Sequence, residues 1–273
     1  MAQIDARMAG EKAADTVATG YPSLDRVLGG GFRRQDLVVL GGDVGSGKSA
    51  LALGVALRAA AGGVPTMYLS GEMSPERVLE RALALEGRAS IDQLRQGQLD
   101  DQTRARVGAA AVKHRDLPLT VRPLSGLAPE ETTSALDVVP HRPQLVIIDS
   151  LQLMASPRHS ARLEERVALS LRRLKALALE RNTIVLALSQ LSHHRAERPD
   201  PRPRLDDLGG VGAVKQHADV VLLIYREEMY RPGQGVEGAT ELIVAKNRNG
   251  SPGFVDLFFY PQWLRFVDML DAD

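Results

Sequence analysis

Short apolar runs alternate with longer helical stretches along most of the chain. The runs carry few polar side chains, as is typical of strands that are buried on both faces. They occupy residues 37–40, 66–70, 119–121, 145–148, 183–188 and 220–225. Helical stretches are expected at 50–61, from 74 onward, and at 100–113, 129–138 and 160–180. The alternation predicts a mostly parallel sheet with helices on both faces.

Two of the expected helices should differ in burial. The stretch 50–61 is apolar nearly all round, so the whole helix should be buried. In the stretch 160–180, apolar residues recur at helical spacing and predict one buried stripe, made of Leu163, Val167, Leu171, Leu174 and Ala178.

The C-terminal part follows a different pattern. The runs 241–246 and 254–259 are separated by a turn rich in Asn and Gly, and a short run follows at 264–267. Connections this short predict antiparallel strands that extend the sheet.

The N-terminal residues 1–17 are polar and alanine-rich and show no strand signal, so a linker stub is expected there. Since the sequence contains no internal repeat, residues 18–273 should form one α/β domain.

Composition excludes some classes of protein and leaves others open. Lysine plus arginine and aspartate plus glutamate number 34 each, so bulk charge gives no argument for nucleic acid or membrane, and such partners would need local patches. The absence of cysteine excludes disulfides and thiolate zinc sites. The apolar runs are too short to span a bilayer and the N-terminus has no secretory apolar core, so we expect a soluble, cytoplasmic protein.

Candidate chemistry begins with a glycine-rich stretch after the first predicted strand. Residues 42–49 read G-x-x-x-x-G-K-S, a pattern that arises by chance in roughly 1–2 per cent of chains this long. Glycine N–H groups and the start of the next helix would bind phosphates, a lysine would reach the outer phosphates, and a serine hydroxyl would bind Mg²⁺. The predicted nucleotide-binding residues are Gly42, Asp43, Val44, Gly45, Ser46, Gly47, Lys48 and Ser49.

Three polar residues follow other apolar runs, at the strand ends where ligands bind in open parallel sheets. Asp149 is expected to hold Mg²⁺, although an aspartate there could also cap the next turn. Glu72 could be a general base for an attacking water or a surface glutamate before a helix. Gln190 could sense the γ-phosphate or be an ordinary polar strand end.

Several blocks together resemble one family. The chain from about Val17 to Phe266 is similar to the motor domain of DnaB-type replicative helicases. The blocks that carry the resemblance are Thr19–Arg26, Ser70–Ser74, Ile148–Met154, Leu188–Leu191, Ala218–Val221, Ile224–Glu228 and Lys246–Gly250.

This resemblance implies a RecA-like P-loop NTPase fold and a hexameric ring with ATP and Mg²⁺ bound between subunits. It implies that Asp149 is the Walker B acid, that Glu72 is the catalytic base and that Gln190 couples the γ-phosphate state to DNA loops. Lys246 and Arg248 match the family's trans-acting lysine and arginine finger, although a solvated hairpin tip is the alternative reading.

The resemblance also indicates where single-stranded DNA would bind. The stretch 206–214 aligns with the loop that grips the DNA backbone, but Gly209 and Gly210 stand where the family commonly has Arg-Glu. Backbone N–H groups of Gly209, Gly210 and Gly212 could still contact phosphates. Arg195, in the basic loop 193–204, is a further candidate, and an ordinary solvated loop explains that stretch equally well.

Three function hypotheses follow, and the third is a non-motor: a nucleotide-gated scaffold or a partner of a true helicase. The first is an ATP-hydrolysing motor that translocates on single-stranded DNA and unwinds duplex as a ring, with a full-length helicase, a loader or primase as further partners. The alternative is a RadA-like or RecA-like DNA-dependent ATPase in recombination, repair or phage replication that does not unwind processively. The alternative is motivated by the absence of the family's N-terminal collar domain, by Gly209-Gly210 and by RadA-like glycine loops at 28–31 and 42–47.

Overall fold

One mixed sheet organises the fold. In the computed structural model, which describes residues 15–124, 129–139, 141–154, 163–192, 198–233 and 235–270, nine strands form this sheet. Their order is β11 (Arg265–Asp268), β10 (Gly253–Tyr260), β9 (Ala239–Asn247), β8 (Val220–Arg226), β3 (Leu37–Gly42), β7 (Ile184–Gln190), β6 (Leu145–Asp149), β4 (Thr66–Ser70) and β5 (Leu119–Pro123).

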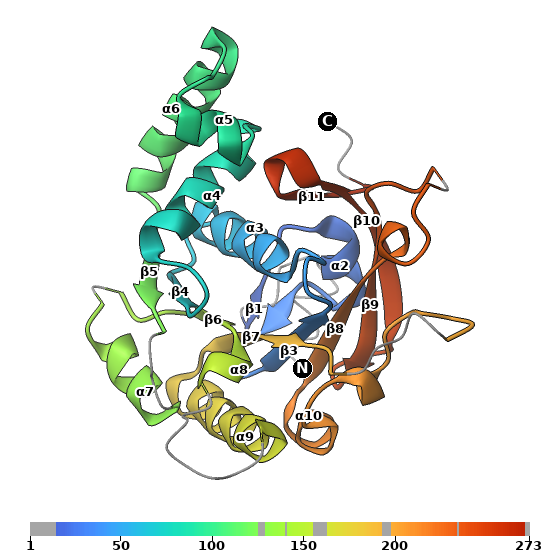
Figure 1. Cartoon of the computed structure of the whole chain (residues 1–273). Helices are drawn as coiled ribbons and strands as arrows, with labels where there is room; N and C mark the ends of the chain where they lie inside the picture. Colours follow the sequence, from blue (N-terminus) through green and yellow to red (C-terminus); the bar gives the residue numbers. More distant parts are fainter. Residues whose placement is uncertain are drawn as a thin grey trace, which may run out of the picture.

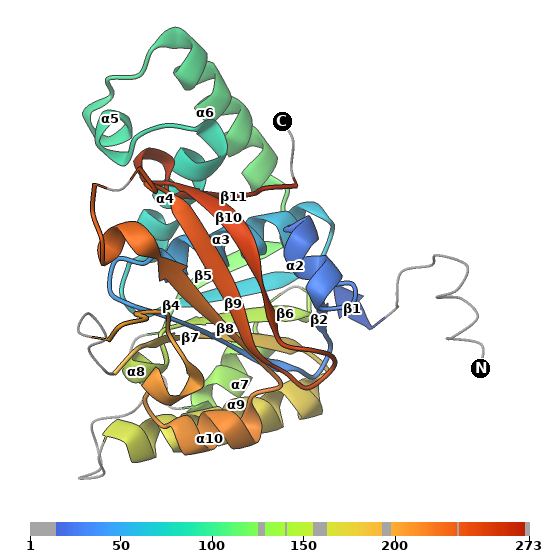
Figure 2. The same ribbon diagram turned by 90° about the vertical axis from the view of Figure 1, so that its right-hand side faces the viewer.

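The pairing confirms the predicted sheet. Strands β8, β3, β7, β6, β4 and β5 are parallel, and β9, β10 and β11 extend the sheet antiparallel from β8. Figure 2 shows the antiparallel strands side by side toward the viewer. The short turns between β9, β10 and β11 permit only antiparallel pairing, whereas the parallel strands need helical crossovers.

Helices cover both faces of the parallel strands, as predicted (Figure 1). Their bounds are α2 (Pro22–Val27), α3 (Lys48–Ala61), α4 (Pro75–Gly87), α5 (Ile91–Gln96), α6 (Asp101–Arg115), α7 (Pro129–Asp137), α8 (Leu151–Met154), α9 (Leu163–Arg181) and α10 (Val211–His217). Three single 3₁₀ turns are η1 (Leu205–Asp207), η2 (Glu227–Met229) and η3 (Pro261–Trp263).

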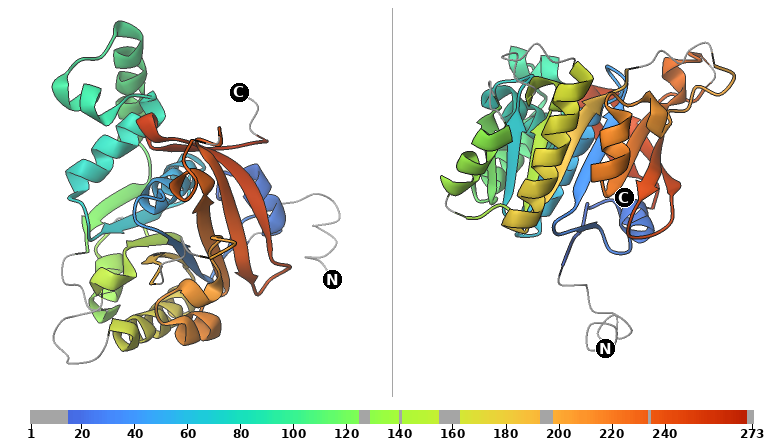
Figure 3. Two further views of the ribbon diagram at one scale, coloured as in Figure 1. Left: turned by 45° about the vertical axis from the view of Figure 1, so that its right-hand side comes forward. Right: turned by 90° about the horizontal axis from the view of Figure 1, so that it is seen from below.

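Alternation along the central strand divides the core into two layers. Val38 and Leu40 of β3 pack in the core that contains α3, whereas Leu37 and Val39 pack in the core that contains α9. Since both faces are covered, every residue of β3 is buried. Figure 3 shows α9 (yellow) lying along the strands in the view from below.

The two burial predictions had different outcomes. Ten residues of α3 are buried, so the expectation of a buried helix is confirmed. The stripe on α9 is buried at Val167, Leu171, Leu174 and Ala178, but the prediction for Leu163 is wrong, because its side chain is 49% exposed. The turn before α10 packs on α9 at Val167, one helical turn away, whereas Leu163 is the first residue of α9.

Two very short strands were not predicted. β1 (Thr16–Val17) pairs antiparallel with β2 (Phe32–Arg33), so the expectation of no strand within residues 1–17 is wrong at its last two positions. Val17 and Phe32 are buried in the α3 core, and this packing stabilises a pair of strands too short to give a sequence pattern. The division between a stub at 1–17 and a domain at 18–273 stays a prediction.

Among the described residues, no helix combines the length and the apolar character needed to cross a lipid bilayer.

The approach of β1 to β2 gives a test of this packing. Gly31 has φ of +119°, and a Cβ there would lie 2.2 Å from the Val17 carbonyl oxygen. Gly31→Ala should therefore lower the free energy of unfolding by about 3 kcal/mol or more, since backbone strain and a clash with fixed backbone add together. Thermal or denaturant unfolding measures this loss.

Gly29→Ala is the matched control. Gly29 also has positive φ, +71°, but a Cβ there meets nothing within 4 Å. Its cost should be limited to the left-handed conformation, about 1–2 kcal/mol. Equal losses for the two variants would contradict a close packing of β1 on this turn.

Candidate functional site

The glycine-rich stretch forms a tight turn between β3 and α3. Gly45 and Gly47 have φ of +79° and +97°, a left-handed conformation that favours glycine. A Cβ at Gly47 would lie 2.8 Å from the ring of Phe266. Because α3 begins at Lys48, the N–H groups of its first turn are free of intrahelical partners and available to an anion.

The predicted loop residues divide into two groups. Val44, Gly45, Gly47, Lys48 and Ser49 line a cavity of about 520 Å³. Gly42, Asp43 and Ser46 do not line the cavity but support the loop. Gly42 and Asp43 contribute carbonyl groups to hydrogen bonds, Ser46 is buried, and the Asp43 carboxylate accepts a hydrogen bond from the hydroxyl of Tyr230.

Lys48 folds back over the loop. Its Nζ donates hydrogen bonds to the carbonyl oxygens of Gly42 (3.0 Å) and Asp43 (2.8 Å). Burial lowers the pKa of Lys48, and the carboxylates of Glu72, Asp149 and Asp43 oppose that shift. A bound polyanion would favour the charged form further, so the site suits phosphate groups.

The three predicted strand-end residues meet in the same cavity. Glu72, Asp149 and Gln190 line it together with Lys48 and Ser49. Register explains their proximity, because Ser70 pairs with Asp149 and Gly42 pairs with Gln190. The structure therefore brings Glu72, Asp149 and Gln190 to the same edge of the sheet as the glycine loop.

Asp149 is held by a side chain that sequence reasoning missed. Asp149 is buried, and its Oδ2 accepts a hydrogen bond of 2.7 Å from the hydroxyl of Tyr68. Burial and the negative charge of Asp149 raise the pKa of Tyr68, so its hydroxyl stays protonated and remains a donor. The pattern of β4 gave no signal for this role, since Tyr68 lies inside an ordinary apolar strand.

Further side chains line the cavity without having been predicted: Arg81, Arg226, Phe259, Pro261 and Leu264. Arg226 Nη1 donates to the Gly45 carbonyl at 3.1 Å, and its guanidinium lies 4.4 Å from the ring centroid of Phe259. Arg226 ends the apolar strand β8, so the rule that selected Asp149 could have found it. Phe259 and Leu264 come from the antiparallel extension, which that rule does not cover.

Lys246 and Arg248 lie at the opposite end of the sheet. Lys246 pairs with Val221 near the start of β8, whereas the glycine loop follows the last residue of β3. Neither residue lines the cavity that contains Lys48. The structure thus does not bring them to the nucleotide site of their own chain.

The predicted DNA-contacting glycines lie in and after the turn that precedes α10. Gly210, with φ of +69°, is the N-cap of α10, and Gly212 lies in its first turn. A bridge between Leu191 and Leu208 holds this turn close to Gln190. Arg195 lies outside the described residues, and contact of Gly209, Gly210 and Gly212 with DNA stays a prediction.

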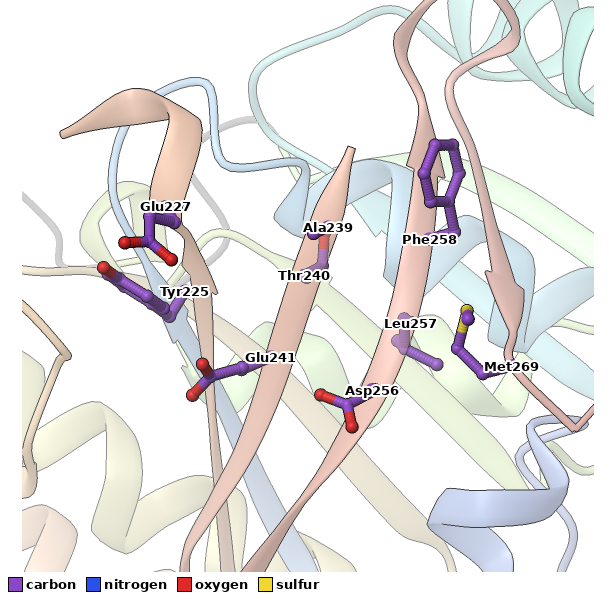
Figure 4. A pocket seen from close by; sticks show the side chains of 9 residues that line it. All are labelled: Tyr225, Glu227, Ala239, Thr240, Glu241, Asp256, Leu257, Phe258 and Met269. Carbon is purple, nitrogen blue, oxygen red and sulfur yellow. The ribbon is translucent and has the colours of Figure 1, made fainter. Parts of the chain in front are cut away.

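A second cavity, of about 360 Å³, lies over the antiparallel strands (Figure 4). It contains the carboxylates of Glu227, Glu241 and Asp256, and no lysine or arginine is found among the described residues that line it. Its charge is therefore unsuited to a triphosphate, and it contributes nothing to the candidate nucleotide site.

The residues fit ATP with Mg²⁺. Magnesium in nucleotide sites is bound by one or two protein oxygens together with water and phosphates rather than by a protein cage. The Ser49 hydroxyl and the Asp149 carboxylate supply such oxygens on one cavity wall. In the described part of the chain, no group of three or more His, Asp or Glu side chains forms a separate metal site.

The family model for the DnaB-like helicase C terminal domain matches residues 16–268. The chain belongs to this family. The resemblance seen in the sequence is therefore confirmed, as is the RecA-like fold.

Known relatives agree with this assignment. The chain is 34% identical over 256 residues to the replicative DNA helicase DnaB of Leifsonia xyli subsp. xyli, covering 93% of this chain and 56% of the relative. A solved structure described as an ATPase domain superposes with a TM-score of 0.87 at 25% identity, covering 98% of this chain and 97% of that one. A DnaB-like replicative helicase, solved in a study of its interactions with primase, gives the same TM-score and identity, covering 98% of this chain and 66% of that one. The chain spans little more than half the length of the curated relatives that it matches.

Lys48→Ala tests the nucleotide site. Removing the ammonium group should weaken binding of a fluorescent ATP analogue by about 100-fold, because charge-assisted contacts to the phosphates are lost. Lys113→Ala, which removes an exposed lysine paired with Glu86, is the control and should bind as the unaltered chain does. Unchanged affinity in Lys48→Ala would exclude this cavity as the nucleotide site.

Proposed function

We propose that this chain is the ATP-hydrolysing motor of a DnaB-type helicase, translocating on single-stranded DNA and unwinding duplex as a cytoplasmic hexameric ring. One observation carries the proposal. Lys48, Ser49, Glu72, Asp149 and Gln190 line one cavity, whereas the arginine finger candidate Arg248 lies at the other end of the sheet with its side chain 48% exposed. Each end of the sheet would then carry half of an ATP-hydrolysing site.

Each residue in the cavity has a chemical role in this proposal. Lys48 and the loop N–H groups hold the phosphates, and Ser49 and Asp149 hold Mg²⁺. When bound at these residues, Mg²⁺ would supply positive charge opposite the phosphates. Glu72 is exposed and carries no cap or ion pair in the described structure, so its carboxylate is free to orient a water and accept its proton. Gln190 lines the same cavity and would sense the γ-phosphate of bound ATP.

The second half of the site is assigned to a neighbouring copy. Lys246 and Arg248 of one copy reach the triphosphate on the next, where the planar guanidinium of Arg248 makes paired contacts to the transferred phosphoryl group. In comparable phosphoryl-transfer sites an arginine supplied in this way raises the hydrolysis rate roughly 10³- to 10⁵-fold.

Single-stranded DNA is assigned to the Gly209–Gly210 turn. The bridge between Leu191 and Leu208 joins this turn to the strand that ends in Gln190, which supports a coupling of nucleotide state to DNA contact. Phosphate contacts make such binding fall steeply with salt. Primase, a loader or a full-length helicase are further partners in this proposal, in line with the solved helicase described with primase.

Arg248→Ala is the first test. We expect ATP hydrolysis to fall by at least about 10³-fold while affinity for the ATP analogue stays close to that of the unaltered chain, because the residue acts on the neighbour's site. Steady-state hydrolysis and analogue titration measure the two effects. Normal hydrolysis in Arg248→Ala would refute the shared site and with it the ring motor.

The second test separates the motor from a DNA-dependent ATPase that does not unwind. Gly209-Gly210, in place of a charged pair, favours the latter as the second candidate. The motor should form hexamers in light scattering with ATP analogue and single-stranded DNA, hydrolyse ATP faster with DNA, and separate a forked duplex. DNA-stimulated hydrolysis without strand separation would support the second candidate instead.

A further inference from the structure

Both proposed trans-acting side chains are held by the same small surface. Lys246 Nζ donates to the carbonyl oxygens of Lys215 and Ala218, each at 2.6 Å. Arg248 Nη2 donates to the carbonyl of Gln216 at 2.9 Å, and its Nη1 contacts Asp219 Oδ1 at 2.8 Å. We call the three carbonyls and the Asp219 carboxylate the cation seat.

The chemistry of the cation seat suits two positive groups. The last carbonyls of a helix have no intrahelical partners and carry partial negative charge. Lys215 and Gln216 lie in the last turn of α10, and Ala218 directly follows it. Asp219 adds a full negative charge beside them.

Asp219 is fixed more firmly than the side chains that it holds. It is 3% exposed, and its Oδ2 accepts hydrogen bonds from the Leu37 N–H (2.8 Å) and from Lys175 Nζ (2.7 Å). The Asp219 carbonyl also accepts from the Arg248 N–H at 2.8 Å. Oδ2 of Asp219 is thus bound to the sheet and to α9, which leaves Oδ1 to accept the hydrogen bond from Arg248.

A second contact holds the turn that carries Arg248. Asn249 Nδ2 donates to Asp36 Oδ2 at 2.8 Å, just before β3. The turn between β9 and β10 is therefore tied to the start of the central strand at two points, through Asp219 and through Asp36.

We propose that Asp219 is a positioning residue that, with the carbonyls at the end of α10, presents Lys246 and Arg248 to the triphosphate of the neighbouring copy. The inference rests on the proposed function. Long cationic side chains lose much rotamer freedom when they are fixed, and a seat that fixes them beforehand removes that cost from the catalytic step. An ion pair that served only to stabilise the fold would need only Lys175, yet Asp219 divides its oxygens between Lys175 and Arg248.

Asp219→Asn is the direct test. The substitution keeps the shape but removes the charge that orients the guanidinium. The rate kcat for ATP should fall about 10- to 100-fold with little change in KM, because misplacement of a catalytic group affects turnover rather than the neighbour's nucleotide binding. Asp137→Asn, which breaks a carboxylate–arginine pair with Arg181 elsewhere, is the matched control and should keep full activity.

Subunit mixing distinguishes positioning from a structural effect. Asp219→Asn copies have an intact Lys48, and Lys48→Ala copies have an intact cation seat. In a mixture, some interfaces combine the Lys48 site of an Asp219→Asn copy with the cation seat of a Lys48→Ala copy. Hydrolysis should return at those interfaces. Recovery should equal that of an Arg248→Ala and Lys48→Ala mixture. A structural defect in Asp219→Asn copies would not be repaired by mixing.

The outcomes separate the inference from the proposed function. If the Arg248→Ala mixture fails to recover, the shared site itself is refuted. If it recovers but the Asp219→Asn mixture does not, or if Asp219→Asn alone keeps full kcat, the positioning role is overturned. If thermal denaturation shows that Asp219→Asn does not fold, Asn249→Ala is used instead, because it loosens the same turn at an exposed position. A reduced kcat that recovers on mixing would support positioning by the held turn. Full activity before mixing would overturn the claim that the turn must be held in place.

Discussion

The structure depends on the end of the central strand β3, which has no room for side chains. A Cβ at Gly41 would lie 2.7 Å from Leu223 and 2.8 Å from Leu208, and one at Gly42 would lie 2.5 Å from the Ser46 hydroxyl. The central strand can therefore enter the loop between its neighbours only as bare backbone. The strand leads directly into the glycine loop that lines the cavity, and the surrounding strands deliver polar and charged side chains to the same edge.

The architecture was largely predictable because it is encoded in local patterns. Buried strands such as β6 and β7 read as apolar runs, and their polar ends identified Asp149 and Gln190. Contacts between distant segments were not predictable. Tyr68 binds Asp149 from inside a strand, and β1 exists because Val17 and Phe32 share a core that no local pattern reveals. Leu163 fits the helical stripe but, as the first residue of α9, is half exposed.

The antiparallel extension does more than widen the sheet. At one end its residues Phe259 and Leu264 complete the wall of the nucleotide cavity, and Phe266 packs against Gly47. At the other end the turn between β9 and β10 carries Lys246 and Arg248 on the cation seat. One hairpin therefore joins the candidate nucleotide cavity and the cation seat through continuous paired strands.

In the proposed ring, the separation of these two ends restricts how copies can associate. A patch at one end that complements a different patch at the other end makes a heterologous contact. In such a contact two copies cannot pair symmetrically through the same patch. Repeated contacts of this kind either close on themselves or continue as an open helix, depending on the rotation between successive copies. In the proposed assembly, the angle between the two end patches of a single sheet would determine whether assembly closes or propagates.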